Sequence, residues 1–250
     1  MLTSLKTFLY TFTLLLLISC DSKAEIPSIH VQNDEVYFFE QGKNGRYNNQ
    51  EDRKKSTNLI AFQLSNPTDK KLLFFIDQEE LTFASSPIEK SEIAGLYGIV
   101  KDSISVATLS SPLINPEVTE VIKVSQSIYF YNDSLKRIKY DLLGLGNNPY
   151  LDEFEKYNKH AIVLHPKEVK TFYVLINLPI VKEQNREIGQ IAYSEFLDLT
   201  DFHTFQFCYA SDAKYVQSML PDFVLKELAE NQVEIFDGII YSKPVPLKKR

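Results

Sequence analysis

The stretch LIAFQLSNPTDKKLLFFI, residues 59–76, holds two apolar runs joined by a polar connection. In the first run Ile60, Phe62 and Leu64 stand at every second position, so they would share one face of a strand. The connection Ser65–Lys70 carries the proline and asparagine side chains that favour turns, and it leads directly into the second apolar run. The sequence therefore predicts a strand, a turn and a second strand here.

Short aromatic and β-branched runs, separated by turn residues, recur along the chain and are typical of strands. The candidate strands are Val36–Phe39, Asn58–Leu64, Lys71–Ile76, Val121–Tyr131, Ala161–Leu164, Lys170–Leu178, Thr204–Tyr209 and Val233–Tyr241. Many short strands with few helices favour two packed antiparallel sheets. We therefore predict a mainly β fold.

The unit made by a strand, the turn Asn66-Pro67-Thr68-Asp69 and a second strand resembles the immunoglobulin-like sandwich domains of exported bacterial proteins. A comparable turn, His165–Glu168, precedes the apolar run that ends at Leu178. The resemblance is one of pattern, and it implies an antiparallel β-sandwich of the immunoglobulin-like type.

One stretch near the C-terminus has helical periodicity. From Ala213 to Asn231 the apolar residues fall 3, 4, 7, 8 and 12 positions after Val216, which places them on one helical face. Pro221 lacks the amide hydrogen needed inside a helix, so it should kink this helix or begin a second one. We expect this amphipathic helix to pack on the sandwich, with a helix for partner binding as the alternative.

The dipeptide Asp237-Gly238 separates the apolar runs Val233–Phe236 and Ile239–Tyr241. A two-residue Asp-Gly link suits a type I′ turn, because glycine adopts positive φ values without steric cost. The sequence predicts a β-hairpin here, with the two flanking strands paired to each other.

Two long polar connections interrupt the strands. Gln41–Thr57 has one aromatic residue among charged and amide side chains, and we expect it to lack regular structure. Gly144–Lys159 ends in aromatic and acidic residues, so it could present Tyr150, Phe154 and Tyr157 to a ligand, or fold over one sheet edge.

The N-terminus has the three parts of an export signal. Met1–Thr7 carries one cation, Phe8–Ile18 is an apolar run of 11 residues, and polar residues follow. A membrane-spanning helix needs about 20 apolar residues, whereas a signal peptide needs about 7–15. The run ends in Leu17-Ile18-Ser19-Cys20, which resembles the lipobox of bacterial lipoproteins.

The resemblance implies cleavage before Cys20 and attachment of membrane lipid to its sulfur and amino group. Several acyl chains are needed because one chain binds a bilayer only reversibly. The domain division expected is a signal peptide at 1–19, a lipidated cysteine and tether at 20–28, and one β-rich domain at 29–250, with two subdomains there as the alternative. The alternative is an incidental cysteine in an uncleaved or conventionally cleaved leader.

The composition, rich in Lys, Asn, Ile and Tyr, resembles proteins of low-GC genomes, including many Bacteroidota. Lipid anchoring to a bacterial membrane is expected, on the outer membrane or a periplasmic face. Surface display is one alternative, because in that group acidic residues shortly after the cysteine can direct it, and Asp21 and Glu25 loosely fit this pattern. Inner-membrane retention is another, because Asp directly after the cysteine implies it in enteric bacteria. The sequence does not indicate which membrane leaflet carries the anchor.

Charge and cysteine content narrow the partners. The net charge is −6, and loss of Lys6 with the signal makes it −7, which excludes nucleic acid because phosphate binding needs clustered cations. The only other cysteine, Cys208, lies in a strand-like run, and we expect a buried, unreactive thiol.

No catalytic motif or cofactor signature is present in the sequence. Asp198, Asp201 and His203 have a spacing that could bind a divalent cation, although a capped loop with a surface histidine explains them equally well. We expect no cofactor. Acidic residues such as Asp152-Glu153 and Glu155 could serve acid–base chemistry.

The function expected is a non-catalytic envelope module that binds a protein or glycan near the membrane. The alternatives are a lipoprotein hydrolase with scattered carboxylate or Asp/His residues, and a structural subunit of an envelope assembly. An exposed apolar patch would favour protein binding.

Overall fold

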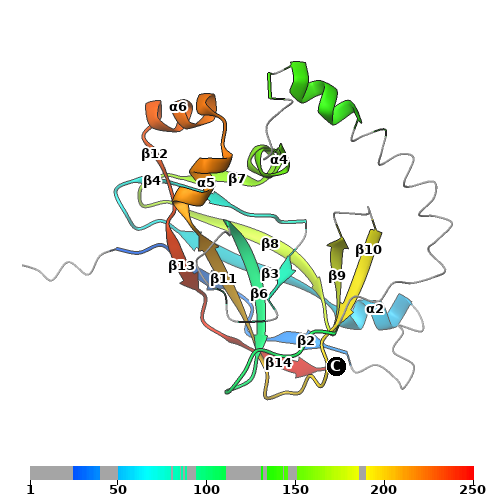
Figure 1. The fold of residues 1–250 in the computed structure, drawn as a ribbon. Coiled ribbons are helices and arrows are strands. Elements are labelled where there is room, and N and C mark those ends of the chain that lie inside the picture. Colours follow the sequence, from blue (N-terminus) through cyan, green and yellow to red (C-terminus); the bar gives the residue numbers. More distant parts are fainter. Residues whose placement is uncertain are drawn as a thin grey trace, which may run out of the picture.

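Short strands joined by turns make up most of the chain that the computed structural model describes. The described residues are 25–39, 50–79, 81–84, 86, 88, 94–110, 131, 134–142, 144–145, 151–185 and 190–250. The fold over these residues is mainly β, with several sheets (Figure 1).

The first sheet contains three antiparallel strands in the order β1-β3-β8. These are β1 (Ser28–Val31), β3 (Thr57–Ser65) and β8 (Val169–Asn177). Buried side chains alternate with exposed or partly exposed ones along β3, as the sequence pattern predicts, and along most of β8. Ile60, Phe62 and Leu64 are all fully buried, so the predicted inward face of β3 is confirmed.

The second sheet is centred on β11 (Thr204–Ser211), which is buried along nearly its whole length. On one side β11 pairs antiparallel with β6 (Ala94–Lys101), and β5 (Thr82–Phe83) adds to β6 in parallel. On its other side β11 pairs with β13 (Gly238–Tyr241) and then β14 (Val245–Lys249). The short β2 (Val36–Phe38) pairs in parallel with β14.

The main core lies between these two sheets. The Phe62 ring of β3 lies 4.7 Å, between centroids, from that of Phe207 on β11, and 5.4 Å from that of Phe172 on β8. Buried residues of both sheets belong to one apolar cluster. Two sheets with a shared apolar interior form a sandwich-like arrangement, as in Figure 1.

A third, smaller sheet lies at one end of the sandwich, in the order β12-β4-β7. Its strands are β12 (Val233–Ile235), β4 (Lys71–Phe75) and β7 (Ala161–Leu164). The backbone N–H of Phe75 donates to the Tyr209 hydroxyl at 3.0 Å, which ties β4 to β11.

The helices α4 (Leu151–His160), α5 (Ala213–Met219) and α6 (Asp222–Glu230) gather beside this sheet (Figure 1). Residues 131 and 134–142 are also helical. The remaining elements are α2 (Gln50–Ser56) and the antiparallel pair β9 (Ile180–Asn185) and β10 (Gln190–Glu195).

The amphipathic segment near the C-terminus forms two helices that are separated at Pro221. Of the two outcomes expected from the proline, the structure shows the second. The Asp212 side chain caps α5 by accepting from the backbone N–H groups of Lys214 and Tyr215. Val216 and Val224 are buried in a second apolar cluster with residues of β4, separate from the main core. The helices therefore pack chiefly on the small sheet.

The turn after β3 is held by one buried side chain, Asn66. Its amide nitrogen donates to the carbonyls of Lys70, Leu164 and His165, and its oxygen accepts from the backbone and hydroxyl of Thr68. Its backbone N–H donates to the carbonyl of Glu168. Both turns singled out in the sequence therefore meet at Asn66.

The predicted Asp237-Gly238 hairpin is wrong. β12 pairs in parallel with β4, and β13 pairs with β11, so the two strands that flank the dipeptide belong to different sheets. Gly238 has a φ of +144°, a value that favours glycine, but it serves a crossing between sheets. The sequence correctly predicted a strand on each side of the dipeptide, but the prediction that these two strands pair with each other was wrong.

The prediction that Gln41–Thr57 lacks regular structure is corrected in part, and the connection Gly144–Lys159 is largely helical. The end of the Gln41–Thr57 stretch forms α2 and the first residue of β3, while residues 41–49 lie outside the described part. Much of the Gly144–Lys159 stretch is α4. The candidate strand Val121–Tyr131 lies outside the described residues except for Tyr131, which is helical.

Candidate functional site

A helical cap is built from the long connections between sandwich strands. We use this name for α4, α5 and α6, which lie beside the small sheet, together with the 134–142 helix, which lies beyond α4 (Figure 1). The connection from β3 to β6 supplies β4, that from β6 to β8 supplies α4 and β7, and that from β11 to β13 supplies α5, α6 and β12. The cap lies at the end of the sandwich where β3 ends and β8 begins.

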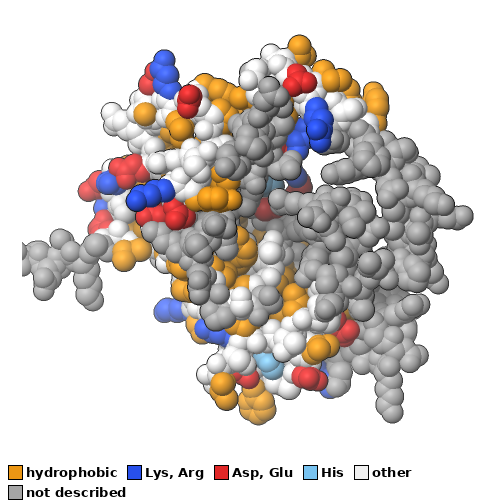
Figure 2. All heavy atoms as spheres, in the orientation of Figure 1, with side chains coloured by type: hydrophobic (Ala, Val, Ile, Leu, Met, Phe, Trp, Pro, Cys, Tyr) orange, Lys and Arg blue, Asp and Glu red, His pale blue; other side chains and the backbone are white. Residues whose placement is uncertain are grey.

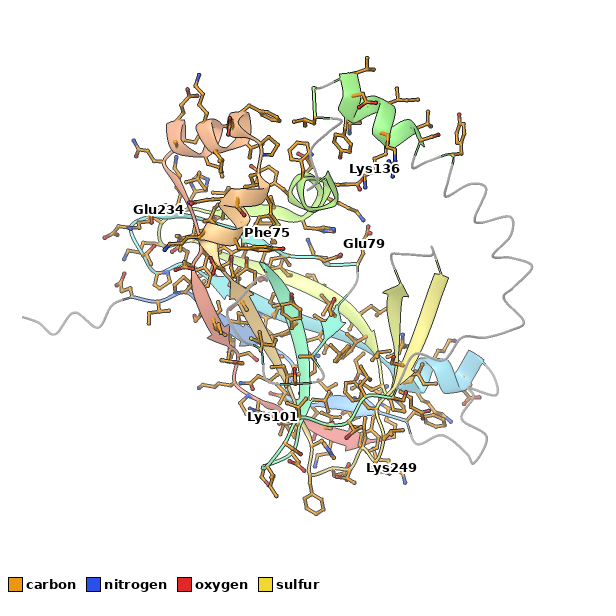
Figure 3. The ribbon with its side chains drawn as sticks, viewed as in Figure 1. Phe75, Glu79, Lys101, Lys136, Glu234 and Lys249 are labelled. Atoms are coloured by element: carbon orange, nitrogen blue, oxygen red, sulfur yellow. The ribbon has the colours of Figure 1, made fainter. Side chains whose placement is uncertain are left out.

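The 134–142 helix is seated on α4 through one side. Tyr140 is 2% exposed, and its ring meets that of Phe154 edge-on with centroids 5.8 Å apart. Lys136 forms an ion pair with Glu155 of α4. Figure 3 shows Lys136 on the side of its helix that is nearer α4. These two contacts fix which side of the helix faces the protein.

The opposite side of this helix carries an exposed apolar stripe. We define the stripe as Tyr131, Leu135, Ile138 and Leu142, which are 63%, 47%, 54% and 83% exposed. Each residue advances a helix by about 100°, so Leu135, Ile138 and Leu142 point the same way and Tyr140 points away from them. Tyr131 is also helical and has the spacing that continues this row. Figure 2 shows hydrophobic side chains along the upper rim, over this helix.

The stripe has the geometry of a helix that packs on another helix. Its spacings of 4, 3 and 4 residues match the seam of a coiled coil. A soluble protein gains nothing by exposing such a row, and contiguous exposed apolar patches mark interaction surfaces. The stripe is therefore the candidate functional site.

The support beneath the stripe is aromatic. Phe154 of α4 contacts Tyr157 in a stacked arrangement at 6.4 Å and Phe223 of α6 edge-on at 5.9 Å, both between ring centroids. Burial raises the pKa of Tyr157, and the charge of Glu227 adds to this effect. The rings join α4, α6 and the 134–142 helix in one body, which holds the stripe in a defined position.

Two of the three aromatic residues that the sequence offered for ligand binding lie inside the protein. Phe154 is buried and Tyr157 is half-buried, so both support the cap from inside. Tyr150 lies outside the described residues.

The structure does not gather Asp198, Asp201 and His203 into a metal site. Asp201 accepts a hydrogen bond from the backbone N–H of Lys249 at 2.8 Å. The Nδ1 of His203 accepts from the backbone N–H of Thr200 at 3.1 Å. Over the part of the chain that is described, no three His, Cys, Asp or Glu side chains are grouped to hold a metal ion. Local loop capping accounts for Asp201 and His203.

Of the two cysteines, only Cys208 lies in the part of the chain that the structure describes. Cys20 lies outside the described residues. Cys208 is fully buried on β11, and burial raises the pKa of its thiol to about 11. At neutral pH this thiol is protonated, and the thiolate is the reactive form. Cys208 therefore has the burial and protonation state of an unreactive core residue.

The sequence reasoning missed the 134–142 helix. Its signal is present in the chain as the 4-3-4 spacing of apolar residues from Tyr131, but this row begins inside the stretch assigned to a strand. A count of helical spacing across residues 131–142 would have found it.

Comparison with family models, with curated proteins and with solved structures finds no match to this chain. None of the helices among the described residues has the length and apolar character needed to cross a membrane. The class of protein that these observations define is a mainly β protein with a helical cap that exposes an apolar stripe.

Proposed function

We propose that this protein is a lipid-anchored envelope lipoprotein that binds another protein through the stripe and has no catalytic role. The observation that carries the proposal is the row of four exposed apolar side chains on a helix seated by Tyr140 and Lys136. A partner helix could bury this row along its whole length.

The stripe favours a protein partner over a glycan. Three of its four side chains are aliphatic, and they offer no hydrogen-bonding group. Sugar hydroxyls placed against them would lose water without gaining partners, and each unpaired hydroxyl costs free energy. An apolar face of another protein has no such cost.

We further propose that the sandwich is immunoglobulin-like. In that fold strands A, B and E share one sheet, while C, F and G share the other. Taken in chain order, β1, β3 and β8 would be A, B and E, and β6, β11 and β13 would be C, F and G. The observed sheet orders β1-β3-β8 and β6-β11-β13 support this assignment.

The position of the cap supports a binding role within the same proposal. In immunoglobulin variable domains the B–C and F–G connections at one end of the sandwich form the binding surface. Here the corresponding connections, residues 66–93 and 212–237, supply β4, β12, α5 and α6 at that end, while α4 and the helix of the stripe come from the connection between β6 and β8. A cap at that end would present the stripe where related sandwiches present their binding loops.

The anchor is tested at Cys20. Replacing Cys20 with Ser should abolish incorporation of a fatty-acid analogue and release the protein from membranes, because an oxygen there cannot form the thioether. Cys208→Ser is the matched control, since that thiol is buried in the core and should leave labelling unchanged. Full labelling of the Cys20→Ser protein would refute the anchor.

Binding is tested by charging the stripe. The proteins are chemically crosslinked in native membranes and then purified. The double variant Leu135→Glu, Ile138→Glu should carry at least about tenfold less crosslinked partner protein than the parent. Each apolar side chain buried in an interface contributes about 1.5–3 kcal/mol, so two charged replacements suffice for this loss.

The control for this experiment is Ile104→Glu, which changes an apolar side chain that is 91% exposed outside the cap. It should leave recovery of the partner unchanged. All these side chains are exposed, so denaturant midpoints of the three proteins should agree. Equal recovery with the stripe variant and the parent would rule out the stripe as the binding surface.

A further inference from the structure

The outward face of sheet β1-β3-β8 carries no formal charge. Its outward positions are 28 and 30 of β1, each odd position from 57 to 65 of β3, and each odd position from 169 to 177 of β8. None of these twelve residues is Asp, Glu, Lys or Arg. Charged residues make up 24% of the chain, so about three would be expected here.

Apolar side chains on this face meet in register. Leu59 is directly opposite Leu175, and Ala61 is opposite Tyr173. Leu59, Leu175 and Tyr173 are 59%, 60% and 53% exposed. Side chains directly opposite in an antiparallel pair lie about 5 Å apart, so these residues form one patch.

The polar groups of this face are already paired in part. The Thr57 hydroxyl donates to the Asn177 side chain at 2.7 Å beside the Leu59 and Leu175 pair. The other polar residues of this face, Ser28, His30, Gln63, Ser65 and Thr171, carry no formal charge, so a surface that approached the face would desolvate polar groups but no ions. Charged groups, which are the most costly to desolvate, are missing from it.

The chain leading to the proposed anchor enters at one end of this same sheet. β1 begins at Ser28, which pairs with Ser65, and Ser65 in turn pairs with Val169 on β8. Val169 is 52% exposed on the outward face, and Ile26, just before β1, is 63% exposed. Ser28 lies eight positions after Cys20, and a fully extended chain of eight residues spans at most about 26–29 Å.

We propose that the uncharged face of sheet β1-β3-β8 lies against the lipid bilayer, with Leu59, Tyr173 and Leu175 in contact with the headgroup region. The inference rests on the lipid anchor at Cys20 proposed above. The short connection holds the sheet near the membrane, and the face beside the connection has the composition that such a surface tolerates. Tyrosine favours membrane interfaces because its ring is apolar and its hydroxyl is polar.

The chain contains no tryptophan, so a single introduced indole reports on one position without background. Tyr173→Trp places the reporter on the uncharged face. Phe202→Trp is the matched control, because Phe202 is 88% exposed and precedes β11, at the end of the sandwich away from the cap. Both full-length lipidated proteins are reconstituted into vesicles of phosphatidylethanolamine and phosphatidylglycerol, with or without brominated acyl chains.

The expected result is that brominated lipid quenches the Tyr173→Trp emission at least about threefold more than the Phe202→Trp emission, and that the former emission shifts to the blue. Adding Leu59→Glu and Leu175→Glu to the Tyr173→Trp protein should abolish the extra quenching while the protein still floats with vesicles. That second variant separates contact with lipid from attachment through the anchor.

Equal quenching at the two positions in proteins that float with the vesicles would overturn this inference and leave the anchor intact. Failure of the full-length protein to float would overturn both the anchor and the inference. A blue shift without extra quenching by brominated lipid, together with dimeric size, would assign the face to a second copy of the chain and overturn the inference.

Discussion

Phe62→Ala is expected to lower the free energy of unfolding by about 3–5 kcal/mol, the range for truncating a buried phenylalanine. Phe62 is fully buried, and its ring contacts Phe172 in its own sheet and Phe207 in the facing sheet. Removing the ring leaves a cavity where the two sheets meet, because the neighbouring rings are anchored to separate strands. Denaturant unfolding of the purified protein measures the loss.

The matched control is Tyr173→Ala. Tyr173 is also an aromatic residue of the first sheet, on the strand next to β3, but it faces outward and is 53% exposed. Its truncation should cost less than about 1 kcal/mol, as expected for a substitution away from buried features. If the two variants unfold at the same denaturant concentration, Phe62 does not lie between the sheets.

Asn66→Ala should lower the free energy of unfolding by at least about 2 kcal/mol. The Asn66 side chain is buried, and its amide nitrogen donates to the carbonyls of Lys70, Leu164 and His165. The bond to the Leu164 carbonyl is buried and the other two are part-buried, and a buried carbonyl left without a donor costs about 1–3 kcal/mol. Thermal or denaturant unfolding would record the loss, which should be accompanied by faster proteolysis at the turns.

Two further variants separate the roles of the amide. Asn66→Asp keeps an oxygen for Thr68 but removes the donor, so it should be about as destabilising as alanine. Thr68→Ala removes only the hydroxyl that donates to Asn66 and should cost less, about 1 kcal/mol. A mild effect of Asn66→Asp would mean that the donated bonds contribute little to the turn.

The proposed anchor would hold the protein at a membrane by one end of the sheet β1-β3-β8. The uncharged face would contact lipid headgroups, while the cap would present its apolar helix to a protein partner. The charged stripe variant and the charged sheet variant alter different surfaces, so their effects on partner recovery and on lipid quenching should be independent.

Most strands could be predicted from the sequence because a strand produces a local pattern of alternating apolar residues bounded by turn residues. The alternation of Ile60, Phe62 and Leu64 matched the buried face of β3, and the turn residues after it marked where the strand ends. Strands with weak local signals were missed, among them β6, whose sequence AGLYGIVK contains two glycines. Its strand state depends on pairing with β11 along its whole length.

The candidate site was harder to predict than the fold. The stripe residues form a helical row in the sequence, but an apolar row usually marks a buried face. Only the structure shows that Tyr140 takes the buried position and that Ile138 and Leu142 remain exposed. The buried position is decided by Phe154 and Glu155, which come from another helix.

The sequence by itself determined the alternation of β3, the interruption of the last helical stretch at Pro221 and the turn chemistry at Asn66. Each depends on neighbours in the chain, through side-chain periodicity, a missing amide hydrogen or a local hydrogen bond. The tertiary structure alone decided which strands pair and which faces stay exposed. The strands on either side of Asp237-Gly238 could have paired with each other, but β4 and β11 offered hydrogen-bonding edges and buried positions for Ile235 and Ile240. Burial against distant strands outweighs a favourable local turn, because the apolar area removed from water is larger than the preference of two turn residues.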